Sequence, residues 1–347
     1  IIDLPKKIVV GRSVRYNISQ YIKEILPNIS SCLVITGPHV YKIATKEILE
    51  FLEESGINVS NMIVEDSSIK TVEKVLNEVR DLNVDSIISV GGGKVIDVGK
   101  FVAFKKNIPF ISMPTAASHD GIASPFASIK GLERPTSVRT REPVMIIADT
   151  EIITKAPRRL LISGSGDAIA KLTAVLDWRL AYKLKNEYYG EYAASLALLS
   201  AKHIINFSDV IRRYDEEAVR VVIEALISSS IAMCIAGSTR PCSGSEHLFS
   251  HALDVVAPKP ALHGEQCGVG TIMMSYLHGR NWRKVKNTLR KIGAPTTAKE
   301  LGISDYHVIK ALTIAHKIRP ERYTILGESG LTWEAAENLA RITGVID

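Results

Sequence analysis

Residues 84–106, VDSIISVGGGKVIDVGKFVAFKK, combine an apolar strand, a turn of three glycines at 91–93 and a helical pattern from 94 to 106. Glycine lets a backbone approach a ligand closely, and the first amides of a helix carry partial positive charge. Such a turn can therefore bind the diphosphate of a nucleotide. The spacing matches neither G-x-G-x-x-G nor the P-loop motif, so a purely structural strand–helix turn stays the alternative.

The same alternation of short β-branched runs and helical patterns extends through the first 149 residues. Further strands are expected at 33–37, 59–66, 108–114 and 143–150, and helices at about 40–55 and 70–82. Alternation of this kind predicts a mostly parallel sheet with helices on both faces. The polar, non-periodic segment 115–142 predicts a long loop or an irregular hairpin.

After residue 150 the strand pattern ends and long helical patterns follow. These helices are expected at 158–183, 189–206, 215–236, 243–256, 265–278 and 282–292, with shorter ones up to 342. We therefore predict an α/β domain at 1–149, followed by an all-helical domain at 150–347.

The composition is that of an ordinary globular protein: 347 residues, 46% hydrophobic and 23% charged. The net charge of +6 raises nucleic-acid binding as an alternative, but basic and acidic residues are interspersed, which favours a mixed-charge surface suited to an anionic substrate. No apolar stretch reaches the ~18 residues of a membrane span, and the first residues do not resemble a signal peptide. The four cysteines form no CxxC pair, which favours a reduced, cytoplasmic protein.

Three of the nine histidines, His247, His251 and His263, lie in the stretch SGSEHLFSHALDVVAPKPALHGEQ at 243–266. His247 and His251 are four residues apart and share one face of a helix. Ser243 and Glu246 have the spacing of a capping box that would start this helix.

Two prolines, at 258 and 260, are expected to end that helix, and His263 leads the next one. Two helices that meet at this corner would bring their imidazoles to one cavity, so the stretch predicts a metal or proton-transfer site. Unrelated surface or core-edge histidines are the alternative.

A carboxylate is expected to complete the site. Asp167 follows the run SGSG at 163–166 and is expected in the first turn of a long helix, where simple capping is the alternative role. A His/His/Asp site holds zinc with an open position, or ferrous iron. Asp120 is a second candidate acid, with an Asx turn as its alternative. A zinc–thiolate site with Cys242 or Cys267 is a weaker alternative.

Together these residues resemble the archaeal sn-glycerol-1-phosphate dehydrogenases, a family in the superfamily of iron-containing alcohol dehydrogenase, glycerol dehydrogenase and dehydroquinate synthase. The matching motifs are GGGKxxD at 91–97, PTAASHDGxASP at 114–125, GD at 166–167, RPCSGSEH at 240–247 and HG at 263–264. The resemblance spans nearly the whole chain. It implies a Rossmann-like N-terminal domain, a helical C-terminal domain and a cleft between them.

The resemblance also implies the roles of individual residues. Zinc would be held by Asp167, His247 and His263, and the substrate would contact Asp120, Asp167 and His251. The implied residues for NAD(H) or NADP(H) are Gly91, Gly92, Gly93, Lys94, Val95, Ile96, Asp97, Thr115, Ala116, Ala117, Ser118 and Ser124.

The implied reaction is the reduction of dihydroxyacetone phosphate to sn-glycerol 1-phosphate, the backbone of archaeal ether phospholipids. Zinc would polarise the C2 carbonyl, and the proton would come from a zinc-bound water or through His251. The strand ending at Gly37 carries no acid that would repel a 2′-phosphate, so both NADH and NADPH stay open.

Several alternatives stay open at this point. A glycerol dehydrogenase with an unphosphorylated substrate is the nearest, and a dehydroquinate synthase is weaker because its metal site would carry a glutamate where this chain has Asp167. Arg240, Lys171 and His119 are the candidates for binding the substrate phosphate. We also expect a homo-oligomer of undetermined size and no nucleic acid as a partner.

Overall fold

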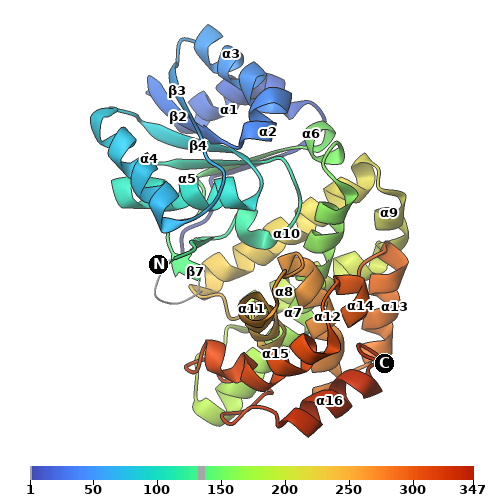
Figure 1. Ribbon diagram of the computed structural model, residues 1–347. Coiled ribbons are helices and arrows are strands. Elements are labelled where there is room, and N and C mark those ends of the chain that lie inside the picture. The colour runs from blue at the N-terminus through green and yellow to red at the C-terminus, as the bar shows by residue number, and fades with distance from the viewer. Residues whose placement is uncertain (1, 132–136) are drawn as a thin grey trace. The chain divides into compact units, whose positions relative to one another are not determined.

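The computed structural model describes residues 2–131 and 137–347 (Figure 1). Residues 132–136, which belong to the predicted loop at 115–142, lie outside the described residues. The chain divides into two compact units, Ile1–Arg158 and Arg159–Asp347. The boundary predicted between residues 149 and 150 lies at the start of a short helix, α6 (Thr150–Thr154). The two units divide a few residues later, after Arg158.

The first unit is built on a six-stranded sheet in the order β1-β8-β5-β4-β2-β3, in which every pair is parallel. The strands are β1 (Lys7–Gly11), β2 (Ser31–Thr36), β3 (Asn58–Ile63), β4 (Ser86–Gly91), β5 (Phe110–Pro114) and β8 (Met145–Asp149). The predicted parallel sheet is confirmed. Edge strand β1 was not predicted, because five half-exposed residues carry little periodic signal.

Helices cover the sheet as the alternating sequence predicts (Figure 1). They are α1 (Ile18–Ile25), α2 (Pro38–Val40), α3 (Lys46–Glu54), α4 (Ile69–Asp81) and α5 (Gly93–Lys106), and a π-helical turn, Tyr41–Thr45, joins α2 to α3. Alternate strand residues such as Val34, Ile88 and Ile111 form one core with Ile18 of α1 and Ile48 of α3. A continuous apolar face therefore holds α1 and α3 against the sheet.

The order of the strands creates a switch point between β2 and β4. The chain builds outward from β2 to β3 and then returns to β4 on the other side of β2. Thr36 pairs with Val90, so Gly37 and Gly91 follow these paired residues at the same level. In open α/β sheets, ligands bind beyond the carboxyl ends of the strands at such a point.

The segment after β5 contains a short antiparallel hairpin, β6 (Phe126–Ser128) with β7 (Ser137–Arg139). The predicted hairpin is thus present. Lys100 of α5 is fully buried, and its Nζ donates to the carbonyl oxygens of Gly121 and Phe126 at 2.6 and 2.7 Å. Lys100 thereby ties the 121–126 segment to the helix that follows the glycine turn.

The second unit is helical throughout its described residues, as the loss of the strand pattern predicts. Its helices are α7 (Arg158–Lys185), α8 (Glu191–Asn206), α9 (Ser208–Arg213), α10 (Glu216–Ala236), α11 (Ser245–Val256), α12 (His263–Leu277), α13 (Trp282–Ile292), α14 (Ala298–Leu301), α15 (Asp305–Ile318) and α16 (Trp333–Ile342). Helix α11 packs against both α12 and α15, so the histidine-bearing segment lies inside the helical unit.

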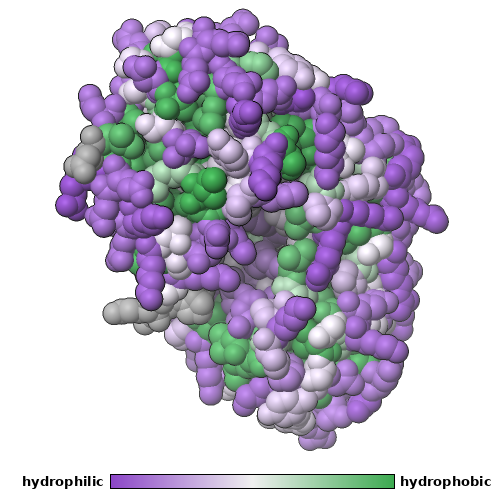
Figure 2. Space-filling model, turned by 45° about the horizontal axis from the view of Figure 1, so that its top comes forward, coloured by the Kyte–Doolittle hydropathy of each residue, from purple (hydrophilic) through white to green (hydrophobic). Residues whose placement is uncertain are grey.

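Helix α10 is the one described helix that is long and apolar enough to cross a membrane by length and composition. It has 21 residues, and 72% of its most apolar window is buried in this structure. Burial of this extent is typical of the central helix of a globular domain. Figure 2 shows hydrophilic residues over most of the visible surface, with hydrophobic residues in smaller groups.

Candidate active site

The candidate site of the second unit is organised by a close crossing of α7 and α12. A Cβ added to Gly166 would lie 2.2 Å from the carbonyl oxygen of Gly264, and one added to Gly264 would lie 1.8 Å from that of Ser163. The amide of Gly264 donates to Ser163 Oγ at 3.2 Å. Two backbones approach this closely only where side chains are missing, so the glycines set the distance between Asp167 and His263.

Asp167 lies well inside α7 rather than in its first turn, so this part of the sequence prediction is wrong. The helix begins at Arg158 and continues through the SGSG run. Glycine weakens a helix by about 1 kcal/mol relative to alanine, but packing against α12 compensates for this cost. Capping as the alternative role of Asp167 is thereby excluded.

Helix α11 begins at Ser245 with Gly244 as its N-cap, so the capping box expected from Ser243 is also wrong. The carboxylate of Glu246 folds back instead. It accepts from the amide of Gly244 at 2.7 Å, from Thr173 Oγ1 at 2.6 Å and from His247 Nδ1 at 2.8 Å. Fully buried Glu246 therefore orients the imidazole of His247 through Nδ1, so that its Nε2 faces Asp167.

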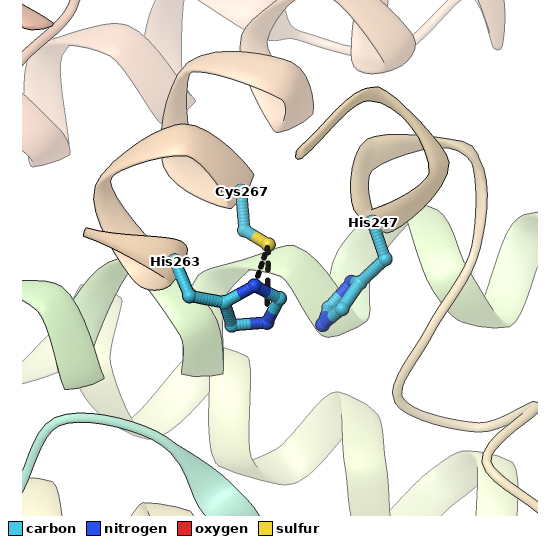
Figure 3. Close-up of side chains that lie close together, drawn as sticks. All are labelled: His247, His263 and Cys267. Carbon is cyan, nitrogen blue, oxygen red and sulfur yellow. Dashed lines mark hydrogen bonds between the residues drawn. The ribbon is translucent and has the colours of Figure 1, made fainter. Parts of the chain in front are cut away.

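His247, His263 and Cys267 lie close together (Figure 3). The histidine stretch predicts this proximity for the two imidazoles. One ligand atom from each of the three residues lies within 4.8 Å of the others. The rings of His247 and His263 are 5.0 Å apart between centroids, and Cys267 Sγ is 3.6 Å from His263 Nε2. Cys267 is one helical turn after His263 on α12, so it faces the same space.

Asp167 joins this group through His247. Its Oδ1 is 3.4 Å from His247 Nε2 and 2.7 Å from Lys171 Nζ. Asp167 and Lys171 are both fully buried. Burial raises the pKa of Asp167, but the charges of Lys171 and then His247 outweigh burial and hold the pKa well below its usual value. Asp167 is therefore an ionised carboxylate, as a metal ligand must be.

The anionic surroundings act on His247 in the opposite direction. Burial lowers its pKa, but the neighbouring Cys267 and the carboxylate of Asp167 raise the pKa well above the usual value. Burial also raises the pKa of the Cys267 thiol.

His251 lies beside the cluster and not within it. Its ring centroid is 5.6 Å from that of His263, and its Nδ1 is 3.7 Å from Asp254 Oδ2. Burial is the main cause that lowers the pKa of His251, although Asp254 opposes it. The neutral ring is one helical turn beyond His247 on α11, where it can contact a ligand that reaches the cluster.

The donor set fits a metal ion. Two imidazoles, an ionised carboxylate and a thiol are the ligands that zinc prefers, and the first three also suit ferrous iron. The resemblance implied Asp167, His247 and His263 as the metal ligands, and a zinc–thiolate site with Cys267 was the weaker alternative. The structure brings ligand atoms of His247, His263 and Cys267 within 4.8 Å of one another, and Asp167 joins them through its 3.4 Å contact with His247. The i, i+4 spacing of His263 and Cys267 is the sequence signal that points to Cys267 as a further ligand candidate.

The cofactor residues named from the sequence lie in the first unit, at the switch point of the sheet. Gly92 is the extended N-cap of α5, and a Cβ added to it would meet no atom within 4 Å. The first intrahelical bonds are made by the amides of Val95 and Ile96 to Gly92 oxygen. The amides before them have no acceptor within the helix, and such a helix terminus favours an anion.

The remaining cofactor candidates border the same edge of the sheet. Gly91 pairs with Pro114, so the segment Thr115–Ser118 begins beside the glycine turn. Thr115, Ala116, Ala117 and Ser124 are buried, while the side chain of Lys94 is exposed. Asp97 is also buried, which raises its pKa, and its Oδ1 is 3.9 Å from Lys100 Nζ. The side chain of Asp97 thus turns inward, and a cofactor would meet the backbone of this turn first.

His119 and Asp120 begin the turn after this segment. A Cβ on Gly93 would lie 1.8 Å from His119 Nε2, and one on Gly121 would lie 2.4 Å from His119 Cε1. The amide of Gly121 donates to His119 Nδ1 at 2.9 Å. His119 therefore packs between two glycines and fixes the turn that carries Asp120.

Three comparisons place the chain among known proteins. A sequence profile described as iron-containing alcohol dehydrogenase matches residues 9–157. A protein of Hyperthermus butylicus named glycerol-1-phosphate dehydrogenase (NAD(P)+) is 56% identical over 345 residues, which is 99% of each chain. A protein of Pyrococcus furiosus with the same name is 55% identical over 346 residues, covering 100% of this chain and 99% of the relative.

Solved structures share the fold at much lower identity. Glycerol dehydrogenase from Schizosaccharomyces pombe has a TM-score of 0.82 at 22% identity and matches 99% of this chain and 90% of its own. A probable glycerol dehydrogenase from Sinorhizobium meliloti has a TM-score of 0.79 at 20% identity, over 100% and 99% of the two chains.

Proposed function

Because this chain belongs to the glycerol-1-phosphate dehydrogenase family, we propose that it reduces dihydroxyacetone phosphate to sn-glycerol 1-phosphate with NADH or NADPH. The observation that carries the proposal is the identity of 52–56% with relatives of that name, over nearly the full length of both chains. The product would enter the synthesis of ether phospholipids. We further propose that the protein acts in the cytoplasm as a homo-oligomer.

The second unit would bind the metal and the substrate. Asp167, His247 and His263 would hold a zinc ion, with Cys267 beside them. When bound, zinc supplies a Lewis acid that polarises the C2 carbonyl of the substrate. Glu246 keeps the imidazole of His247 in the orientation that binds, and Lys171 keeps Asp167 ionised.

The first unit would bind the cofactor, which supplies the hydride when present. The backbone of the 91–97 turn would bind its diphosphate, because the amides at the start of α5 have no intrahelical acceptor. Gly37, at the end of β2, has no acidic side chain that would repel the 2′-phosphate of NADPH. Both forms of the cofactor can therefore be accommodated there.

His251 and Asp120 would act on the substrate itself. The neutral imidazole of His251 can donate a hydrogen bond to the oxygen at C2 and pass a proton to it from solvent. Asp120, held by the packed His119 turn, would accept a hydrogen bond from a substrate hydroxyl.

An absorbance assay of nicotinamide oxidation tests the proposal directly. We expect turnover with dihydroxyacetone phosphate, loss of turnover after chelation and its recovery with zinc. Chiral analysis should identify sn-glycerol 1-phosphate as the product. Turnover with dihydroxyacetone but not with its phosphate would instead indicate a glycerol dehydrogenase.

A second experiment tests the ligand set. We expect the His263→Ala variant to lose bound metal together with activity, because the remaining protein ligands cannot hold the ion well. Metal analysis that finds one zinc per chain in this variant would show that His263 is not a ligand.

A further inference from the structure

Three arginines of the second unit, Arg240, Arg319 and Arg322, meet near the start of α11. Arg322 donates from Nη1 to the carbonyl oxygen of Ser243 and from Nη2 to Thr239 Oγ1. Arg240 Nη2 donates to the carbonyl oxygen of Tyr323 at 3.0 Å. The segments 239–243 and 319–323 therefore interlock just before the helix that carries His247 and His251.

Arg319 stands at the C-cap of α15, which packs against α11. Its residue surface is 8% exposed, and its Nε is buried without a hydrogen-bond partner. Within residues 2–131 and 137–347, no carboxylate lies within ion-pair distance of this guanidinium. A buried guanidinium with free donors is unfavourable and is uncommon in folded proteins.

The whole arginine cluster has too few acceptors for its charge. Arg240 forms two hydrogen bonds with Glu187, at 2.7 and 2.5 Å, yet its Nη1 is buried without a partner. Arg322 binds only a neutral carbonyl and a neutral hydroxyl. Among the described residues, three guanidinium groups thus share one carboxylate in ion-pair contact.

Helix packing connects this cluster to the active-site histidines, because α15 ends at Arg319 and packs against α11, the helix of His247 and His251. Burial is the main cause that lowers the pKa of His251, and the charges of His247 and then Arg319 lower it further. Burial likewise lowers the pKa of Arg322 to about 9, and its arginine neighbours add to the shift. The arginine-bearing segments 239–243 and 319–323 therefore border the helix that carries His251.

We infer that Arg319, supported by Arg322 and Arg240, binds the phosphate group of the substrate beside His251. A phosphate dianion offers several acceptors to guanidinium donors and neutralises the excess charge. This inference rests on the proposed function, since it names the subsite that selects a phosphorylated triose. The other two cations named from the sequence are engaged: Lys171 with Asp167, and His119 between two glycines.

The test compares two substrates that differ only in the phosphate. For Arg319→Met we expect kcat/KM with dihydroxyacetone phosphate to fall about 100-fold, because truncating a buried charge contact has an effect of this order. The value with dihydroxyacetone should change less than about threefold. Arg220→Met is the matched control, because Arg220 is exposed on α10 and pairs with Glu224. It should leave both values unchanged.

Thermal unfolding distinguishes a phosphate-binding role of Arg319 from a purely structural role. Without anions, Arg319→Met should melt at or above the wild-type temperature, because it removes a buried and unpaired charge. Inorganic phosphate should raise the melting temperature of the wild type more than that of the variant. A variant that melts lower and gains equally from phosphate would overturn the inference.

The kinetic outcomes separate the inference from the proposed function. Absence of wild-type turnover with dihydroxyacetone phosphate would refute the function, whereas the phosphate-dependent melting would still test the anion site. Equal losses with both substrates in Arg319→Met would overturn the phosphate assignment. A raised KM for NADPH, with the KM for dihydroxyacetone phosphate unchanged, would assign the arginines to the cofactor and overturn it as well.

Discussion

Replacing Gly264 by alanine should disrupt the metal site by a single methyl group. The added Cβ would lie 1.8 Å from the carbonyl oxygen of Ser163 and 2.8 Å from Ser163 Oγ. Because the first neighbour is backbone, a rotamer change cannot relieve the clash. The helices α7 and α12 would have to separate by roughly 1.5 Å at this crossing to restore normal contact.

Such a separation affects both stability and metal binding. Overpacking of this kind costs about 3 kcal/mol, and the better helix propensity of alanine returns about 1 kcal/mol. The net loss of about 2 kcal/mol would lower the melting temperature of a unit of this size by about 4–8 °C. Asp167 and His263 are each adjacent to a glycine of the crossing, and ligand distances tolerate shifts of only about 0.2 Å. The free energy of zinc binding should therefore fall more than the free energy of unfolding.

Equilibrium dialysis with zinc and thermal unfolding, both on the same preparation, measure the two effects. Gly268→Ala is the matched control on the same helix, since its Cβ would meet the flexible end of Leu289 at 3.3 Å. This control should keep wild-type zinc affinity. If Gly264→Ala also kept wild-type zinc affinity and melting temperature, the glycine crossing would not set the ligand positions.

Three further predictions address the cofactor, the substrate and the stability of the first unit. Gly92→Val should raise KM for the nicotinamide cofactor much more than KM for the substrate, because its side chain would fill the open space at the start of α5; equal effects on both would indicate a structural turn. His251→Ala should keep its zinc and lose at least ~10-fold in kcat/KM, so zinc analysis and kinetics on one sample decide its role. The hydrogen bond from Arg15 lowers the pKa of Glu151 to about 2 from its usual 4.5. This depressed pKa contributes stability above pH 4.5 that is lost as the pH falls through 2, so Glu151→Gln should melt with a weaker pH dependence in that range; an unchanged dependence would exclude this pair as its source.

The sequence by itself determined the architecture of both units. The alternation of β-branched runs and helices predicted the parallel sheet, and the loss of that pattern after residue 150 predicted the helical unit. These features depend on periodicity and on local turns, which a linear sequence contains. The proximity of His247 to His263 could also be predicted, because a proline-containing corner joins their helices.

Only the tertiary structure decided which partners complete the site. The SGSG run reads as a turn along the chain, but it continues a helix because Gly166 packs on Gly264, nearly one hundred residues away. The cap expected from Ser243 is replaced by the contacts of Glu246 with Thr173 and His247. Arg319 has no distinctive local pattern in the sequence, and only the structure shows that its Nε is buried without a hydrogen-bond partner among the described residues. Each of these features depends on the close approach of segments distant in sequence, which local periodicity does not specify.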